Sequence, residues 1–179
     1  MSKREVLIGV TGGIAAYKSA MLVSRLVQQG YGVSVMMTEA AEAFVGQATF
    51  AALTGRPVAR HLFSEHQSPL GAHIDLTRRA DLLCVAPATA NFLSKAAHGA
   101  ADDLLTTSYL AFQGPVLVAP AMNVQMWEHR AVQRNITQLR DDGVEIVDPG
   151  EGWLSCRDQG GGRMAEPEQI QAAIEKRLS

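Results

Sequence analysis

Cysteine is scarce in this sequence, and long hydrophobic runs and an excess of charge are absent. Two cysteines among 179 residues cannot form a disulfide framework, which favours a reducing, cytoplasmic setting. The formal net charge of -2 offers no basic surface for nucleic acid or for an anionic membrane. No apolar run approaches the about 20 residues that a membrane span needs, and the start lacks the apolar stretch of a secretory signal. We therefore expect a cytoplasmic protein with neither nucleic-acid nor membrane partners.

Short β-branched runs alternate with longer segments of helical pattern along the chain. The runs that we predict to be strands span residues 6–10, 33–37, 82–86, 116–119 and 144–147. The segments that we predict to be helices span residues 14–29, 39–53, 91–97, 103–112, 125–141 and 167–178. The strands are apolar throughout, as in strands covered on both faces. This order predicts one α/β domain over residues 1–179, a three-layer, doubly wound parallel sheet that binds ligands outside the carboxyl ends of its strands.

The segment GVTGGIAAYK, residues 9–18, joins the first predicted strand to the first predicted helix. It matches neither the G-x-G-x-x-G dinucleotide fingerprint nor the Walker loop. Backbone N–H groups of Gly12, Gly13 and Ile14 at a helix N-terminus favour an anion such as a phosphate. The alternative is a tight strand-to-helix turn without a ligand. Lys18 lies about one turn into the helix and need not reach such a ligand.

Three further strands end in small or polar turns at the same predicted edge. Thr38, after the second strand, is either the N-cap of the next helix or a second phosphate donor. After the third strand, Thr89 and Asn91 in APATAN either cap a helix or bond to a flat ligand. After the fourth strand, APAMNVQMW presents Asn123, with the same capping alternative, beside the apolar Met126.

Together, these four turns favour a planar ligand that carries a phosphate and lies across the edge of the sheet. A dinucleotide site usually has an acidic residue for a ribose hydroxyl after the second strand. Only Glu39, immediately beyond Thr38, offers one here. This weakens the case for NAD and leaves room for a mononucleotide such as FMN.

Residues 149–162, PGEGWLSCRDQGGG, contain too much glycine for a helix or a central strand. We expect a loop or flap here, at about residues 149–163. A loose surface connection is the alternative, although Trp153, Leu154 and Cys156 each gain from burial. His73, in GAHIDLTRRAD, is one of five histidines, and physical grounds alone do not select it.

These segments together resemble the flavin-dependent cysteine decarboxylases, and most closely the phosphopantothenoylcysteine decarboxylases. The resemblance covers nearly the whole chain and rests on GVTGGIAAYK, HIDL, ADLLCVAPATAN, GAADDLLTT, PAMNVQMW and SCRDQGGGRM. The specific P-x-M-N-x-x-M-W pattern matches at every fixed position of residues 120–127. The resemblance implies a Rossmann-like, flavodoxin-like fold, FMN as cofactor, and a homotrimer or a multiple of it with the flavin between subunits.

The implied cofactor site uses the turns described above. The FMN phosphate would be held by Gly12, Gly13, Ile14 and Thr38. The rest of the cofactor would be lined by Phe44, Ala88, Thr89, Ala90, Asn91 and Ala121.

The implied reaction is the decarboxylation of 4′-phosphopantothenoylcysteine to 4′-phosphopantetheine in coenzyme A biosynthesis. A cysteine amide has no electron sink for the loss of its carboxylate, so prior oxidation of the carbon bearing sulfur explains the need for a flavin. By resemblance, Asn123 would bind the carboxylate, and Met126 and Trp153 would contact the substrate. His73, from a neighbouring subunit, would act as an acid–base group, and Cys156 would donate a proton in the final reduction.

The chain departs from the family pattern at two positions. Arg157 follows the flap cysteine where the family commonly has Gly, and Phe92 stands where related chains often carry a small polar residue. Both departures leave the identity of the substrate open, but neither speaks against the type of reaction.

Three alternatives to this function share its fold or its cofactor. A peptidyl-cysteine decarboxylase would stop at a C-terminal ene-thiol, whereas Cys156 with its G-x-G-R-M tail favours completing the reduction. A flavin prenyltransferase lacks the P-x-M-N-x-x-M-W element. A non-enzymatic, FMN-binding regulatory subunit often bears a long acidic tail, which is not present up to Ser179. The sequence does not separate a free-standing chain from one cut from a fusion with the synthetase.

Overall fold

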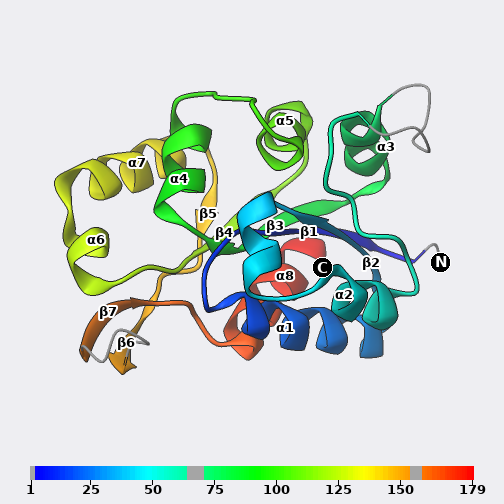
Figure 1. Ribbon diagram of the computed structural model, residues 1–179, viewed down its shortest axis with the longest axis horizontal. Helices are drawn as coiled ribbons and strands as arrows, with labels where there is room; N and C mark the ends of the chain where they lie inside the picture. The colour runs from blue at the N-terminus through cyan, green and yellow to red at the C-terminus, as the bar shows by residue number, and fades with distance from the viewer. Residues whose placement is uncertain (1–2, 64–70, 154–158) are drawn as a thin grey trace.

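The computed structural model describes residues 3–63, 71–153 and 159–179. Its centre is a five-stranded sheet of parallel neighbours in the order β2-β1-β3-β4-β5 (Figure 1). The strands are β1 (Glu5–Val10), β2 (Gly32–Met37), β3 (Leu82–Ala88), β4 (Val116–Pro120) and β5 (Glu145–Ile146). This is the flavodoxin-like strand order. The predicted α/β, doubly wound parallel sheet is confirmed.

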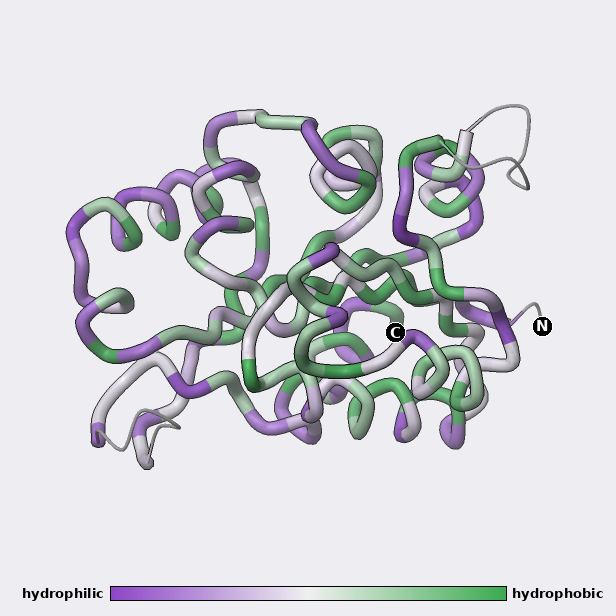
Figure 2. Tube along the Cα trace, in the orientation of Figure 1, coloured by the Kyte–Doolittle hydropathy of each residue, from purple (hydrophilic) through white to green (hydrophobic). Residues whose placement is uncertain are grey.

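Helices cover both faces of the sheet and make it the middle of three layers (Figure 1). One face is covered by α1 (Ala16–Gln28), α2 (Gln47–Thr54) and α8 (Pro167–Leu178). The other is covered by α3 (Ala72–Arg79), α4 (Ala90–Ala97), α5 (Leu104–Ala111) and α7 (Arg130–Asp141). Hydrophobic residues follow the strands and the inward sides of the helices (Figure 2). Within the described ranges, no helix combines the length and apolarity that a bilayer span needs.

Two of the predicted helices are interrupted. Residues 39–53 form a 3-10 helix, η1 (Glu39–Ala43), and then α2, because Gly46 is extended between them and serves as the N-cap position of α2. Residues 125–141 are divided into α6 (Val124–Glu128) and α7. His129 is extended at this break, and its Nδ1 accepts a hydrogen bond from the backbone N–H of Ala131 at 3.2 Å. A side chain that satisfies a free N–H of the new helix favours starting it there.

The segment expected to be a loop forms an antiparallel hairpin, β6 (Gly150–Trp153) and β7 (Gln159–Arg163). Leu154, Cys156 and Arg157 lie outside the described residues. A Cβ atom at Gly162 would lie 2.5 Å from the carbonyl oxygen of Met122, and Gly162 has a φ of +103°. The Gly162 carbonyl accepts a hydrogen bond from the Met122 N–H at 2.9 Å. Glycine therefore serves close packing against the start of α6, which the loop prediction missed.

A partly buried ion pair fixes the amino end of β1 to the segment after α2. The Arg56 guanidinium donates to both carboxylate oxygens of Glu5, at 2.6 and 2.9 Å, and to the hydroxyl of Ser34 at 3.0 Å. The two charged side chains are only 31% and 24% exposed. The hydrogen bond from Arg56 holds the pKa of the Glu5 carboxyl below its ordinary value of 4.5.

We expect Glu5→Gln to destabilise the fold near neutral pH by about 1–2 kcal/mol, because Arg56 loses a bidentate partner. A carboxyl with a lowered pKa stabilises the folded state above its unfolded pKa, and this contribution disappears as pH falls through the folded pKa. The wild-type advantage should therefore be present at about pH 7 and shrink at about pH 3.

Urea unfolding of both proteins at the two pH values measures this effect. Asp148→Asn is the matched control, since Asp148 pairs with Arg140 at a site where the two side chains are 48% and 63% exposed. The control should unfold almost as the wild type does. An equal loss for Glu5→Gln at both pH values would contradict the proposed ionisation.

Candidate functional site

A cavity of about 1060 Å³ opens at the carboxyl edge of the sheet. The four predicted turns meet in it, since each contributes lining residues next to the end of its strand. These lining residues are Thr11, Gly12, Gly13, Ile14, Thr38, Glu39, Thr89, Ala90, Asn91, Ala121, Met122 and Asn123. The segment of residues 60–62, the start of α5 and the end of β7 also contribute to the wall. The cavity thus lies between strands whose chains leave toward opposite faces of the sheet.

The glycine loop brings an uncapped helix N-terminus to the cavity. No side chain within the described residues caps α1, whose N-cap position is Ala15. A Cβ atom at Gly12 would lie 2.8 Å from the backbone carbon of Ala40, so η1 packs directly on this glycine. A Cβ atom at Gly13 would meet only the Thr89 Cγ2 atom, at 3.8 Å, which is an ordinary van der Waals contact without a clash. Such a loop allows an anion to approach the first N–H groups of the helix.

The hydroxyl of Thr38 lacks a partner in the described part of the chain. Thr38 occupies the N-cap position of η1, but its side chain makes no capping hydrogen bond. Its Oγ1 atom is buried and unbonded, and the residue lines the cavity. The capping alternative for Thr38 is therefore wrong. A buried hydroxyl without a partner is unfavourable, and a bound acceptor would relieve the cost.

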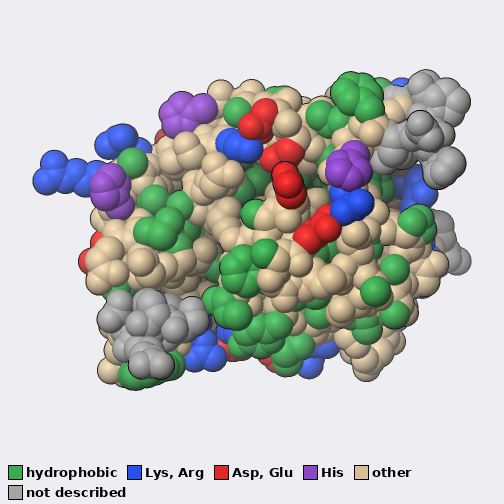
Figure 3. Space-filling view, in the orientation of Figure 1, with side chains coloured by type: hydrophobic (Ala, Val, Ile, Leu, Met, Phe, Trp, Pro, Cys, Tyr) green, Lys and Arg blue, Asp and Glu red, His purple; other side chains and the backbone are tan. Residues whose placement is uncertain are grey.

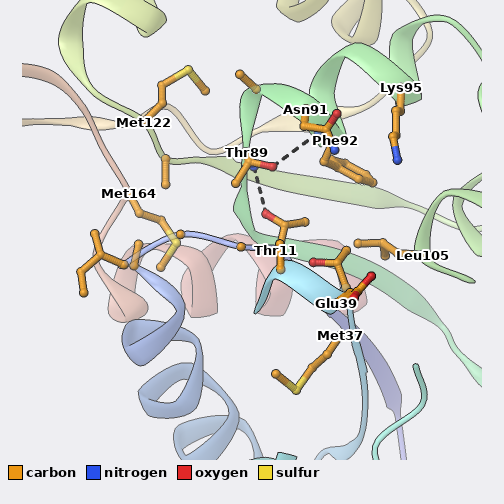
Figure 4. A pocket seen from close by; sticks show the side chains of 18 of the residues that line it. Thr11, Met37, Glu39, Thr89, Asn91, Phe92, Lys95, Leu105, Met122 and Met164 are labelled. Atoms are coloured by element: carbon orange, nitrogen blue, oxygen red, sulfur yellow. Dashed lines mark hydrogen bonds between the residues drawn. The ribbon is translucent and has the colours of Figure 1, made fainter. Parts of the chain in front are cut away.

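Thr89 and Asn123 do cap the helices that they precede. The Thr89 hydroxyl accepts a hydrogen bond from the Phe92 N–H at 3.4 Å (Figure 4). The Asn123 carboxamide oxygen accepts one from the Met126 N–H at 2.8 Å. This bond uses the oxygen of Asn123 and leaves its two N–H donors outside it. Because Asn123 also lines the cavity, capping and ligand binding are compatible for this residue.

Of the other candidate residues, Met126 and Trp153 line the cavity, whereas Phe44, Ala88 and His73 do not. Met126 and Trp153 line it and are 45% and 66% exposed. Ala88 is buried in β3, and Phe44, 47% exposed, follows η1; neither belongs to the lining. His73 lies on α3 and does not line the cavity either. Its Nδ1 atom is buried and has no hydrogen-bond partner among the described residues.

Lys18, which the sequence gave no reason to include, lies beside the cavity. Its side chain is 6% exposed and pairs with Glu166 at 2.9 Å. The ammonium also donates to the carbonyl oxygen of Met164 at 3.1 Å. The hydrogen bond from Lys18 lowers the pKa of the Glu166 carboxyl. Lys18 therefore connects the helix of the glycine loop to the segment that leaves the hairpin.

Paired charges line another part of the cavity, and acidic and basic side chains gather near the middle of this face (Figure 3). Lys95 pairs with Asp102 at 2.8 Å and with Asp103 at 3.3 Å, and the bond to Asp102 raises the pKa of the lysine. Arg60 pairs with Glu42 at 2.5 Å. Among the described residues, no cluster of histidine, cysteine and carboxylate side chains has the geometry of a metal site.

A family model described as Flavoprotein matches residues 1–179. The coenzyme A biosynthesis bifunctional protein CoaBC of Bacillus subtilis (strain 168) is 49% identical over 179 residues, which are 100% of this chain and 44% of that protein. CoaBC of Mycobacterium bovis (strain ATCC BAA-935 / AF2122/97) is 46% identical over 167 residues, which are 93% of this chain and 40% of that protein. The chain thus spans less than half the length of these curated relatives.

Solved structures resemble the fold over almost its whole length. A PPC decarboxylase mutant complexed with pantothenoylaminoethenethiol has a TM-score of 0.88 and 30% identity, and the match covers 98% of both chains. The FMN-dependent cysteine decarboxylase SpaF has a TM-score of 0.86 and 38% identity, and the match covers 98% of this chain and 95% of that one. From its full-length family match and these relatives, the chain belongs to the flavoprotein family.

Proposed function

We propose that this chain is an FMN-dependent carboxy-lyase that converts 4′-phosphopantothenoylcysteine to 4′-phosphopantetheine in coenzyme A biosynthesis. The observation that carries this proposal is the likeness, over 98% of both chains, to a PPC decarboxylase complexed with pantothenoylaminoethenethiol. The curated relatives named for coenzyme A biosynthesis support the same reaction. A cytoplasmic location also belongs to the proposal.

The residues around the cavity fit FMN. The phosphate fits the uncapped N-terminus of α1, where Gly13 has no side chain to block its approach and Thr38 has a buried hydroxyl without a partner in the described chain. We assign the phosphate to Gly12, Gly13, Ile14 and Thr38, and the rest of the cofactor to Thr89, Ala90, Asn91 and Ala121. Phe44 and Ala88 lie outside the lining of this chain's own cavity and are not assigned to it.

The protein's own residues would orient the substrate and handle its protons. When bound, FMN supplies reversible two-electron oxidation of the carbon that bears sulfur, so the overall decarboxylation is redox-neutral. The N–H donors of Asn123 bind the substrate carboxylate as neutral groups, which do not over-stabilise the charge that is lost with CO2. Cys156 delivers the proton that accompanies the final reduction, and Met126 and Trp153 contact the substrate.

We further propose that the chain forms a homotrimer whose copies share the site. His73 lies on α3 and does not line its own cavity, so it reaches substrate only from a neighbouring copy. Its buried Nδ1 lacks a partner in the described chain, and a proton-transfer role suits a histidine. Exposed apolar side chains next to the glycine loop, Ile14 and Tyr17, offer surface for the neighbour.

A peptidyl-cysteine decarboxylase is the second candidate. The cysteine decarboxylase SpaF is 38% identical to this chain, against 30% for the PPC decarboxylase mutant. Such an enzyme would share the FMN site and Asn123 but release the ene-thiol without reducing it.

The glycine loop provides the first test, because Gly12 and Gly13 differ in what surrounds them. Gly12→Ala should lower the unfolding temperature of the apoprotein, since its Cβ atom would overlap the backbone of Ala40. Gly13→Ala should leave that temperature nearly unchanged but weaken FMN about tenfold or more, because its methyl group enters the space for the phosphate. Thermal unfolding and fluorescence titration with FMN measure both effects. Wild-type affinity in Gly13→Ala would refute the assigned phosphate position.

The products of Cys156→Ser test the proposed reaction. Wild-type protein loaded with FMN and given 4′-phosphopantothenoylcysteine without oxygen should release CO2 and 4′-phosphopantetheine, identified by mass. Cys156→Ser should accumulate the decarboxylated ene-thiol, because the final reduction lacks its proton donor. Cys84→Ala is the control, since the Cys84 thiol is buried and burial raises its pKa to about 12. Failure to release CO2 with FMN bound would overturn the proposal. If the wild type itself releases the ene-thiol, a peptide that ends in cysteine is favoured as the substrate.

Mixed oligomers test the shared site. His73→Asn and Asn123→Asp should each be nearly inactive alone, while Asp retains the N-cap of α6. If each site joins Asn123 of one copy to His73 of the next around a ring, an equal mixture assembled together should regain about a quarter of the wild-type activity. Light scattering should show three chains per particle, or a multiple of three. No recovery in a mixture shown to contain both variants in one particle would contradict a shared site.

A further inference from the structure

Thr11 occupies the point where β1 passes into the glycine loop. It is 2% exposed, and its hydroxyl donates to the carbonyl oxygen of Pro87 at 2.7 Å. The hydroxyl oxygen of Thr11 also accepts a hydrogen bond from the backbone N–H of Thr89 at 3.1 Å (Figure 4). One side chain therefore bonds to the backbone on both sides of Ala88, where β3 ends and α4 begins.

The proton of this hydroxyl is already committed. A threonine hydroxyl has one donor and two acceptor lone pairs. Because Thr11 donates to Pro87, it has no proton for a phosphate oxygen, whereas the buried hydroxyl of Thr38 has no partner in the described chain. Thr11 and Thr38 line the same cavity but differ in what they offer an anion.

The turn that Thr11 holds is one wall of the cofactor site. Thr89 caps α4, and the residues that follow it, Ala90 and Asn91, line the cavity. The Thr89 methyl carbon lies 3.8 Å from the Cβ position of Gly13, so this turn is next to the glycine loop. Gly12 follows Thr11 directly in the chain. The Thr11 side chain therefore connects the glycine loop to the N-terminal end of α4.

We propose that Thr11 is a positioning residue for FMN. Its hydroxyl holds the N-terminal end of α4, residues 89–91, at a fixed distance from the loop of residues 12–14, so that both segments contact the cofactor at once. Hydrogen bonds that are formed before a ligand binds reduce the cost of ordering the site. This role rests on the proposed FMN site. Thr11 would act on the cofactor indirectly, by holding the backbone of residues that contact it.

Ser19 offers a matched control in the same region. Its hydroxyl donates to the carbonyl oxygen of Ala86, next to Pro87, and its side chain is fully buried. Ser19 does not line the cavity, and its hydroxyl bonds to Ala86 and not to Thr89. Removing the Ser19 hydroxyl therefore deletes a similar buried hydrogen bond without releasing the N–H of Thr89.

The experiment measures the dissociation constants of FMN and riboflavin for apoproteins by fluorescence titration. Thr11→Val should weaken the binding of both ligands about tenfold or more, since two buried backbone groups in the wall of the site lose their hydrogen-bond partner. Thr11→Ser, which keeps the hydroxyl, should stay within about threefold of the wild type. Ser19→Ala should lower the unfolding temperature but keep both affinities. Thr38→Val should weaken the binding of FMN but leave the affinity for riboflavin, which lacks the phosphate, unchanged.

Each outcome decides the role of Thr11. Wild-type affinities in Thr11→Val, equal weakening by Ser19→Ala, or no rescue by Thr11→Ser would overturn it. If Thr11→Val does not fold, Thr11→Cys takes its place, because a thiol bonds more weakly than a hydroxyl at nearly the same shape. Failure of the wild-type protein to bind either flavin would overturn the proposed cofactor site together with this role. Failure confined to the Thr11 variants leaves the cofactor site intact.

Discussion

The position of β1 between β2 and β3 is the constraint on which the site depends. After β1 the chain turns to one face of the sheet and forms α1, and after β3 it turns to the opposite face and forms α4. Two neighbouring strands that part in this way leave a crevice at their carboxyl ends. Both helices then point their N-termini at the crevice, and their dipoles make it favourable for an anion. The chemistry of the cavity thus follows from strand order before any particular side chain is considered.

The same electrostatics explains the arrangement around Lys18. A cation in the first turn of a helix is opposed by the helix dipole, and burial adds a desolvation cost. Glu166 offsets both, and it stands at the N-terminal end of α8, where an acidic side chain is itself favoured. The pair joins the N-termini of α1 and α8 and, through the carbonyl of Met164, holds the exit of the hairpin beside the cavity. Neighbouring elements of the site are thus connected by a buried lysine that would be unfavourable in α1 without its acidic partner.

Sequence patterns predicted the sheet and its functional edge but not the features that depend on packing. Continuous apolar runs identified each strand of the five-stranded sheet, because strands that are buried on both faces are apolar at every position. The glycines of the hairpin indicated a loop. A glycine can give the backbone freedom, or it can stand where a side chain has no space, as at Gly162, and composition does not distinguish these two reasons. Thr38 and Thr89 looked equivalent in the sequence, each preceding a helix. Only the coordinates show that one hydroxyl caps its helix and the other has no partner in the described chain.

The buried hydroxyls show how one residue type serves different purposes within a single site. Thr89 uses its oxygen for a helix, Thr11 uses both donor and acceptor for a turn, and Thr38 retains its proton. A polar side chain that is fully satisfied within the protein makes its surroundings rigid, whereas one left unsatisfied favours a ligand. Rigid walls matter most beside a group that must bind in one orientation, because loose walls would have to be ordered at the expense of affinity. The cavity therefore combines preformed walls with a small number of uncommitted donors, and the position of those donors determines which end of a ligand carries its charge.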